Sequence, residues 1–110
     1  MQLSKQVLID VSEDASNSTG VQCDGLLLSG IVFPAAMTGT AVTFDFAFDG
    51  STWVDVVETD GTAVSYTVTA GDVVRVDPSG WAFATAGSLR ITSDATEAAD
   101  RKIQLIFKQS

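Results

Sequence analysis

The chain has 110 residues, 14 acidic against 6 basic side chains, a formal net charge of −8, 45% apolar residues and only 18% charged ones. Phosphate binding needs a concentrated positive field, so this charge argues against a nucleic-acid partner. The absence of histidine and the single cysteine, Cys23, exclude histidine-based triads, imidazole metal sites and an internal disulfide.

The first predicted element is a strand over residues 3–11, in which Val7, Ile9 and Val11 share one face at period-2 spacing. Residues 12–20, SEDASNSTG, are polar, which predicts a flexible surface loop. We therefore interpret residues 1–20 as a candidate N-terminal arm plus flexible loop. Such an arm would add its strand to the exposed sheet edge of a neighbouring protein.

The second predicted strand covers residues 25–33, GLLLSGIVF. Its apolar run is continuous, which predicts burial on both faces. Pro34 ends it, because proline cannot donate to a sheet ladder.

Residues 41–57 carry the clearest alternation of the chain and predict a central hairpin. The dipeptide at 49–50, Asp-Gly, favours a tight turn into a second strand over residues 52–57. Asp45 lies on the reverse face of the first strand, where it is expected to meet solvent or an interface, and Trp53 is expected to fill the core. The side chains expected to point into the core are Val42, Phe44, Phe46 and Phe48.

Four further strands are predicted over residues 64–69, 73–77, 88–93 and 101–108, separated by turn sequences. Trp81 and Phe83 fall in a short segment without alternation, where Trp81 is expected either to contact a partner or ligand or to fill the core. Residues 94–100 are predicted to be a loop. About eight short strands with turns every 8 to 12 residues are typical of an all-β fold. We predict one domain over residues 1–110, a single antiparallel β-sandwich for which jelly-roll connections are one arrangement.

The carboxylates are the remaining candidates for catalysis, and a glycoside hydrolase would need two of them facing each other across a cleft. Most of the aspartates lie in turns, where they cap the backbone for local reasons. We therefore predict no catalytic, cofactor-binding or metal-binding residues. The residues predicted to contact partners are Leu3, Val7, Ile9, Val11, Asp45, Trp81 and Phe83, because arms and aromatic anchors are common at interfaces.

Several short phrases, in this order, resemble a family of small virion proteins of tailed bacteriophages, described as head decoration, cement or head-fibre proteins. The resemblance runs from about residue 25 to residue 108 and does not cover the first 24 residues. The matching phrases are GIVFPAA at 30–36, TGT at 38–40, Phe44, DGST at 49–52, DG at 60–61, VDP at 76–78, LRI at 89–91, Ser93 and AADRKI at 98–103.

The resemblance implies a protein without catalytic residues or cofactors that binds the outside of a phage head and bridges neighbouring capsid subunits. Its expected partners are the major capsid protein and other copies of itself, as a homotrimer. The expected location is the virion exterior after synthesis in the host cytoplasm, since no window has the roughly 18 apolar residues of a membrane span and no signal peptide is evident. The alternatives are a carbohydrate-binding module and a tail, fibre or connector component.

Overall fold

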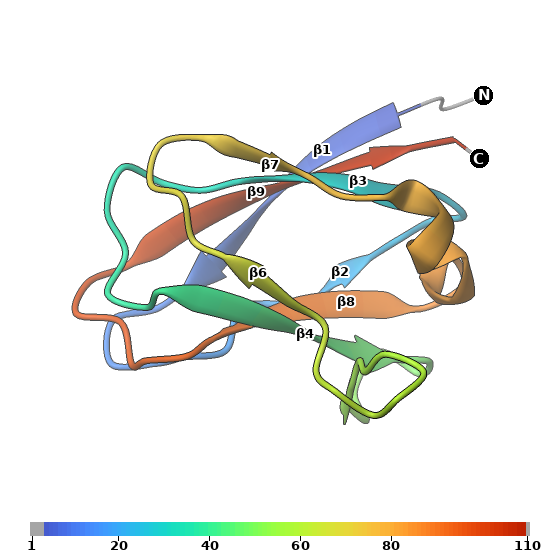
Figure 1. The fold of residues 1–110 in the computed structure, drawn as a ribbon, viewed down its shortest axis with the longest axis horizontal. Coiled ribbons are helices and arrows are strands. Elements are labelled where there is room, and N and C mark those ends of the chain that lie inside the picture. The colour runs from blue at the N-terminus through green and yellow to red at the C-terminus, as the bar shows by residue number, and fades with distance from the viewer. Residues whose placement is uncertain (1–3, 110) are drawn as a thin grey trace.

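Nine strands form two facing antiparallel sheets in the computed structural model, which describes residues 4–109 of the chain (Figure 1). The first sheet has the order β1 (Ser4–Val11), β9 (Arg101–Lys108), β3 (Leu27–Val32) and β7 (Val73–Arg75). The second has the order β2 (Val21–Gln22), β8 (Ser88–Ser93), β4 (Ala41–Ala47) and β5 (Val54–Asp55), and β6 (Ser65–Thr67) also pairs with β4. The chain crosses repeatedly from one sheet to the other. The predicted antiparallel β-sandwich is confirmed.

The core lies between the two sheets and is filled by alternate side chains of their strands. Each strand points every second residue inward, so the period-2 pattern of the sequence becomes one apolar face per strand. The core side chains with at most 1% exposure include Ile9, Val11, Ile31, Ile103, Leu105 and Phe107 from the first sheet, and Val42, Phe44, Leu89 and Ile91 from the second.

The first strand, predicted to be a candidate arm, is an integral part of the sandwich. β1 pairs with β9 of the same chain along its whole length, from Ser4 opposite Lys108 to Val11 opposite Arg101. The following polar segment is also attached, because the backbone N–H of Ser18 donates to the carbonyl oxygen of Ile91 at 2.7 Å. The apolar face of β1 thus completes the core of its own chain.

The prediction that Phe48 points into the core is wrong, since its side chain is 78% exposed. β4 ends at Ala47, so the alternation that places Phe44 inward does not continue to Phe48. Beyond the strand end, the Asp49 carboxylate accepts hydrogen bonds from the backbone N–H groups of Ser51 and Thr52 at 2.9 and 2.7 Å. This local turn takes Phe48 out of the sheet.

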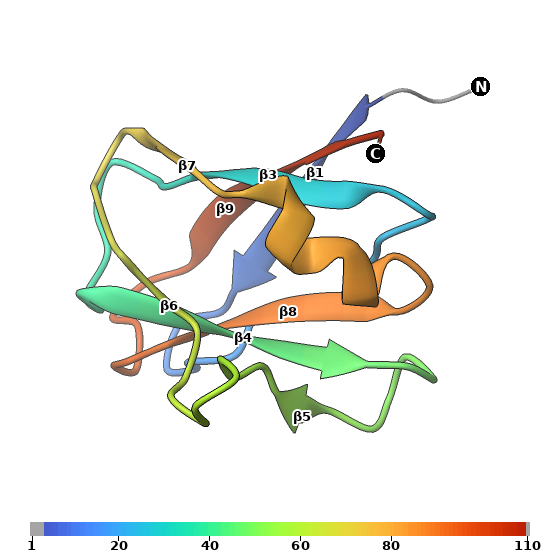
Figure 2. The ribbon, with the colours of Figure 1, turned by 45° about the vertical axis from the view of Figure 1, so that its right-hand side comes forward.

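The segment around Trp81, predicted to be irregular, forms a 3-10 helix, η1 (Pro78–Ala84). Asp77 caps it by accepting from the backbone N–H of Ser79 at 3.1 Å, and Pro78 occupies its first turn. Aspartate followed by proline is a helix-start signal in its own right. Figure 2 shows η1 lying across one open side of the sandwich, between the two sheets.

The connections β3–β4 and β8–β9 are joined by the carboxylate of Glu97, whose side chain is fully buried. It accepts hydrogen bonds from the backbone N–H groups of Thr38 and Gly39 at 2.8 and 2.9 Å. The hydroxyl of Ser93 and the guanidinium of Arg101 also donate to it, at 2.8 and 2.9 Å. Burial alone raises the pKa of Glu97, but these donors outweigh burial and hold the pKa below its ordinary value.

Candidate functional site

Most residues predicted to contact partners lie inside the molecule. Ile9, Val11 and Trp81 are core residues with 1%, 0% and 3% exposure, and Val7 is half-buried against the core. Leu3 lies outside the described residues. The period-2 pattern that suggested an apolar arm surface arises instead from the face of β1 that packs into the sandwich.

Asp45, expected to face solvent or an interface, is buried beneath neighbouring side chains of its sheet. Its carboxylate accepts from the guanidinium of Arg90 at 2.9 Å and from the hydroxyl of Thr92 at 3.0 Å. Trp53, expected in the core, is half-buried with its ring 4.7 Å from the Arg90 guanidinium. Asp45 therefore serves to hold Arg90 beneath this ring.

Phe83 is the predicted contact residue that the structure places on the surface, with 52% exposure. It borders a shallow, mainly apolar hollow together with Phe46, Val54 and Val57, and the exposed side chain of Asp55 also lines this hollow. Val54 and Val57 are 56% and 50% exposed. We call these four residues, Phe46, Val54, Val57 and Phe83, the Phe83 surface.

Two aromatic rings, half-buried Phe46 and buried Trp81, pack against Phe83. Its ring centroid lies 5.4 Å from that of Phe46 and 5.7 Å from that of Trp81. Trp81 in turn packs edge-on against Phe44 at 4.7 Å and donates its indole N–H to the hydroxyl of Tyr66 at 3.3 Å. η1 thus points Trp81 inward and Phe83 outward, so the exposed ring is supported from below.

A groove of about 440 Å³ continues from the Phe83 surface and shares Val57 and Phe83 with it. It is lined by half-buried Tyr66 and buried Trp81 and by the exposed side chains of Glu58 and Asp77. Burial raises the pKa of the Tyr66 hydroxyl, and the charges of Glu58 and Asp77 raise it further against the opposing effect of the Trp81 hydrogen bond. We call this hollow the acidic groove.

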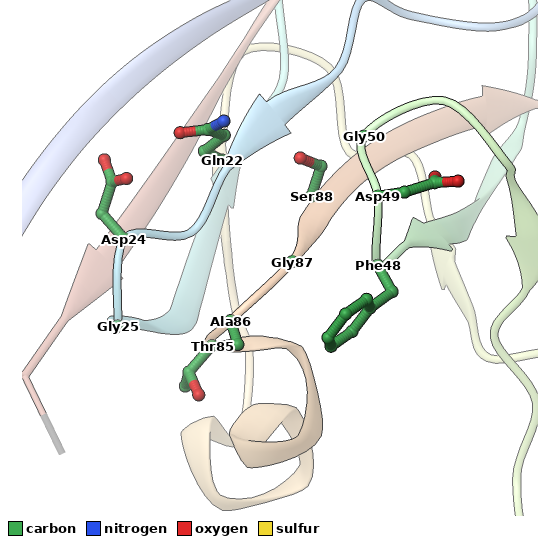
Figure 3. Close-up of a pocket in the computed structure, with 10 residues that line it drawn as sticks. All are labelled: Gln22, Asp24, Gly25, Phe48, Asp49, Gly50, Thr85, Ala86, Gly87 and Ser88. Carbon is green, nitrogen blue, oxygen red and sulfur yellow. The ribbon is translucent and has the colours of Figure 1, made fainter.

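A third hollow, of about 330 Å³, is polar and lies between the segments 22–25, 48–50 and 85–88 (Figure 3). The Asp24 carboxylate at its border pairs with Lys5 at 2.7 Å. The Asp49 carboxylate points away from Asp24 in Figure 3. Hydrogen bonds from the backbone N–H groups of Thr52 and Ser51, and from the Thr52 hydroxyl, lower the pKa of Asp49 to about 2. Both carboxylates are engaged in local structure.

Cys23 offers no nucleophile at neutral pH. Its side chain is 1% exposed. Burial raises the pKa of the thiol to about 11, although the charge of Lys5 lowers the pKa, and the charge of Asp24 adds a smaller increase. The reactive form of cysteine is the thiolate, which is scarce at this pKa.

The described part of the chain shows neither a metal-binding cluster nor a membrane-spanning helix. Among residues 4–109, no three His, Cys, Asp or Glu side chains lie close enough together to hold a metal ion. No helix within the same residues is long and apolar enough to cross a membrane.

Comparison with known proteins gives structural likeness alone. No protein-family model matches the sequence, and no curated protein matches it. The chain is similar to the crystal structure of Yersinia pseudotuberculosis-derived mitogen, with a TM-score of 0.46 and 7% identity over 100% of this chain and 88% of that chain. It is also similar to a chain of Bacillus endospore appendages, described as disulfide-linked pili, with a TM-score of 0.41 and 18% identity over 98% and 88%. At these TM-scores neither similarity bears on function.

Proposed function

We propose that this chain is a non-enzymatic structural virion protein, a decoration or cement protein that binds the outside of a phage head and bridges neighbouring capsid subunits. The observation that carries the proposal is the Phe83 surface, an exposed apolar area on a rigid sandwich. The resemblance of the sequence to small phage virion proteins supplies the identity of the partner, the major capsid protein.

The Phe83 surface has the properties of a contact surface. Exposed apolar patches commonly mark sites of protein interaction, and aromatic residues are enriched in the centres of interfaces. The ring of Phe83 is held by Phe46 and Trp81, so little side-chain freedom remains to be lost on binding. A surface ordered before binding keeps more of its contact energy as affinity.

Binding to heads tests the proposal directly. Serine substitution of both Val57 and Phe83 is expected to raise the apparent Kd for undecorated heads by about 30-fold or more, since central aromatic contacts contribute about 2 kcal/mol or more. Cosedimentation of purified protein with heads that lack decoration measures this. The matched control carries serine in place of Leu8 and Val73, which are 61% and 56% exposed. It should bind undecorated heads as the wild type does. Equal binding by the Val57 and Phe83 variant would contradict the proposal.

The proposal includes a homotrimer as the form that occupies the head. The chain mass is 11.5 kDa, so size-exclusion chromatography with light scattering should give a mass about three times this value. A monomer mass at every concentration tested, including micromolar protein, would exclude the trimer while leaving head binding to be judged by cosedimentation.

A carbohydrate-binding module is the alternative from another class, and the acidic groove favours it because aromatic rings and carboxylates together suit sugars. Trp81, however, is 3% exposed, which leaves Phe83 as the ring able to stack on a ligand. Glycan-array binding that is lost in Phe83→Ala would support this alternative. A tail, fibre or connector location would be recognised by the position of the protein in a particle map.

A further inference from the structure

The acidic groove carries two negative charges that the described part of the chain does not neutralise. Glu58 comes from the loop after β5, and Asp77 is the N-cap of η1. No Lys or Arg of the described residues lines the groove. The four ion pairs found within residues 4–109 join other carboxylates: Lys5 with Asp24, Arg90 with Asp45, Arg101 with Glu97 and Lys102 with Asp10.

The two carboxylates line one groove although they come from separate segments of the chain. Tyr66 lies in the groove beside buried Trp81, and the charges of both Glu58 and Asp77 contribute to its raised pKa after the larger effect of burial. The hydroxyl is therefore in a negative field produced by two separate segments. A cation placed there would be attracted by both carboxylates.

We propose that the acidic groove receives an arginine or lysine side chain that is flanked by apolar residues in a segment of the protein on which this chain docks. The proposal rests on the docking function proposed above and specifies the chemistry of the partner. The aliphatic stem of such a side chain would cover Val57 and Phe83, and its charged head would meet Glu58 and Asp77.

Charge complementarity selects a basic partner over a second copy of this chain. The formal net charge is −8, so a second copy is a poor occupant for a groove that already holds two carboxylates. A copy seated at the groove would bring further negative charge towards Glu58 and Asp77, and like charges opposed across an interface cost several kcal/mol. The negative field that attracts a basic segment would repel the negative charge of a second copy.

The two tryptophans allow a direct test by NMR. Trp81 lines the groove, whereas Trp53 does not line it and contacts Arg90, so their indole ¹⁵N–¹H signals report on a residue of the groove and on one outside its lining. The probe is the peptide acetyl-Gly-Leu-Arg-Leu-Gly-amide, titrated into labelled protein at low salt. We expect the Trp81 signal to move and the Trp53 signal to stay. The same peptide with glutamate in place of arginine should move neither.

Removing the two charges tests the role of the carboxylates. Glu58→Gln with Asp77→Asn keeps side-chain size, and the Asn oxygen still accepts from the N–H of Ser79 to cap η1. We expect this variant to raise the Kd for the arginine peptide about fivefold, as exposed ion pairs contribute modestly. The control variant, Glu13→Gln with Asp14→Asn, removes the same charge elsewhere; Asp14 has a positive φ of 66°, which asparagine tolerates. It should leave the Kd unchanged.

The contrary outcomes are distinct. The proposal would be overturned if the glutamate peptide moved the Trp81 signal as far as the arginine peptide does, or if Glu58→Gln with Asp77→Asn left the Kd for the arginine peptide unchanged. It would also be overturned if that double variant associated with itself more strongly than the wild type, or if a sugar moved the Trp81 signal while the arginine peptide did not. If the Val57 and Phe83 variant loses head binding while the arginine peptide does not move the Trp81 signal, the proposed docking on heads is supported and the proposed basic segment is wrong. If the protein binds the arginine peptide but does not bind heads, the proposed binding of a basic side chain in the groove is supported and the phage head is the wrong partner.

Discussion

Replacing Glu97 with alanine is expected to lower the free energy of unfolding by about 3 to 5 kcal/mol, the usual result when one partner of a buried ion pair is removed. Arg101 would lose its carboxylate while its side chain stays only 16% exposed. The backbone N–H groups of Thr38 and Gly39, which donate to Glu97 at 2.8 and 2.9 Å, would also lose their acceptor. Urea unfolding at pH 7 measures the change. Glu13→Ala, at an exposed position, is the control and should stay within about 0.5 kcal/mol of the wild type.

The stabilisation by Glu97 is expected to depend on pH with a definite sign. The pKa of Glu97 in the folded protein lies below its ordinary value of 4.5. A depressed carboxyl pKa contributes stability that is complete above the pKa of the unfolded chain and is lost as pH falls through the pKa of the folded protein. The difference between the wild type and Glu97→Ala should therefore be constant near neutrality and shrink below about pH 4.5. A difference that does not change with pH would show that Glu97 acts by packing alone.

Replacing Phe44 with alanine is expected to lower the free energy of unfolding by about 3 to 5 kcal/mol. Phe44 is 1% exposed, and its ring packs edge-on against Tyr66 and Trp81 at centroid distances of 5.9 and 4.7 Å. The substitution would leave a cavity where β4 meets η1. Thermal or urea unfolding followed by tryptophan fluorescence would detect it, because Trp81 borders the lost ring.

Phe48→Ala supplies the matched control, since it deletes the same side chain four residues further along the same sequence pattern. Phe48 is 78% exposed, so its removal should change the free energy of unfolding by less than about 0.5 kcal/mol. If Phe48→Ala destabilised the protein as much as Phe44→Ala, the core would extend beyond the end of β4 and the described position of Phe48 would be wrong.

The fold was predictable wherever alternation is regular and turn residues bound it. The strands at 88–93 and 101–108 were predicted with the limits found in β8 and β9. Phe48 shows what period-2 alternation cannot predict, because alternation indicates which face of a strand a residue occupies but does not indicate where the strand ends. The hairpin partner of β4 was overestimated for a similar reason: the predicted strand over residues 52–57 is reduced to the two residues of β5.

The candidate site was less predictable, because it depends on packing between distant segments. Phe83 was named from the sequence, but Val57 was not, since adjacent Val56 and Val57 look alike in sequence while one is buried and the other exposed. The acidic groove brings together residues 58 and 77 through the position of η1, and no local pattern contains that pairing. The aspartate and proline that start η1 were the available signal for it.

The pairing of β1 with β9 also sets the order of folding during synthesis. Ser4 lies opposite Lys108 and Val11 opposite Arg101, so about ninety residues or more separate the two members of each pair. At about 5 to 20 residues per second, a ribosome takes roughly 5 to 20 s to make β9 after β1. Throughout that interval Ile9 and Val11 lack their neighbours in the sheet, and closing such distant pairs is slow. The core-facing side chains of β1 therefore stay without their partners in the sheet until β9 has been made.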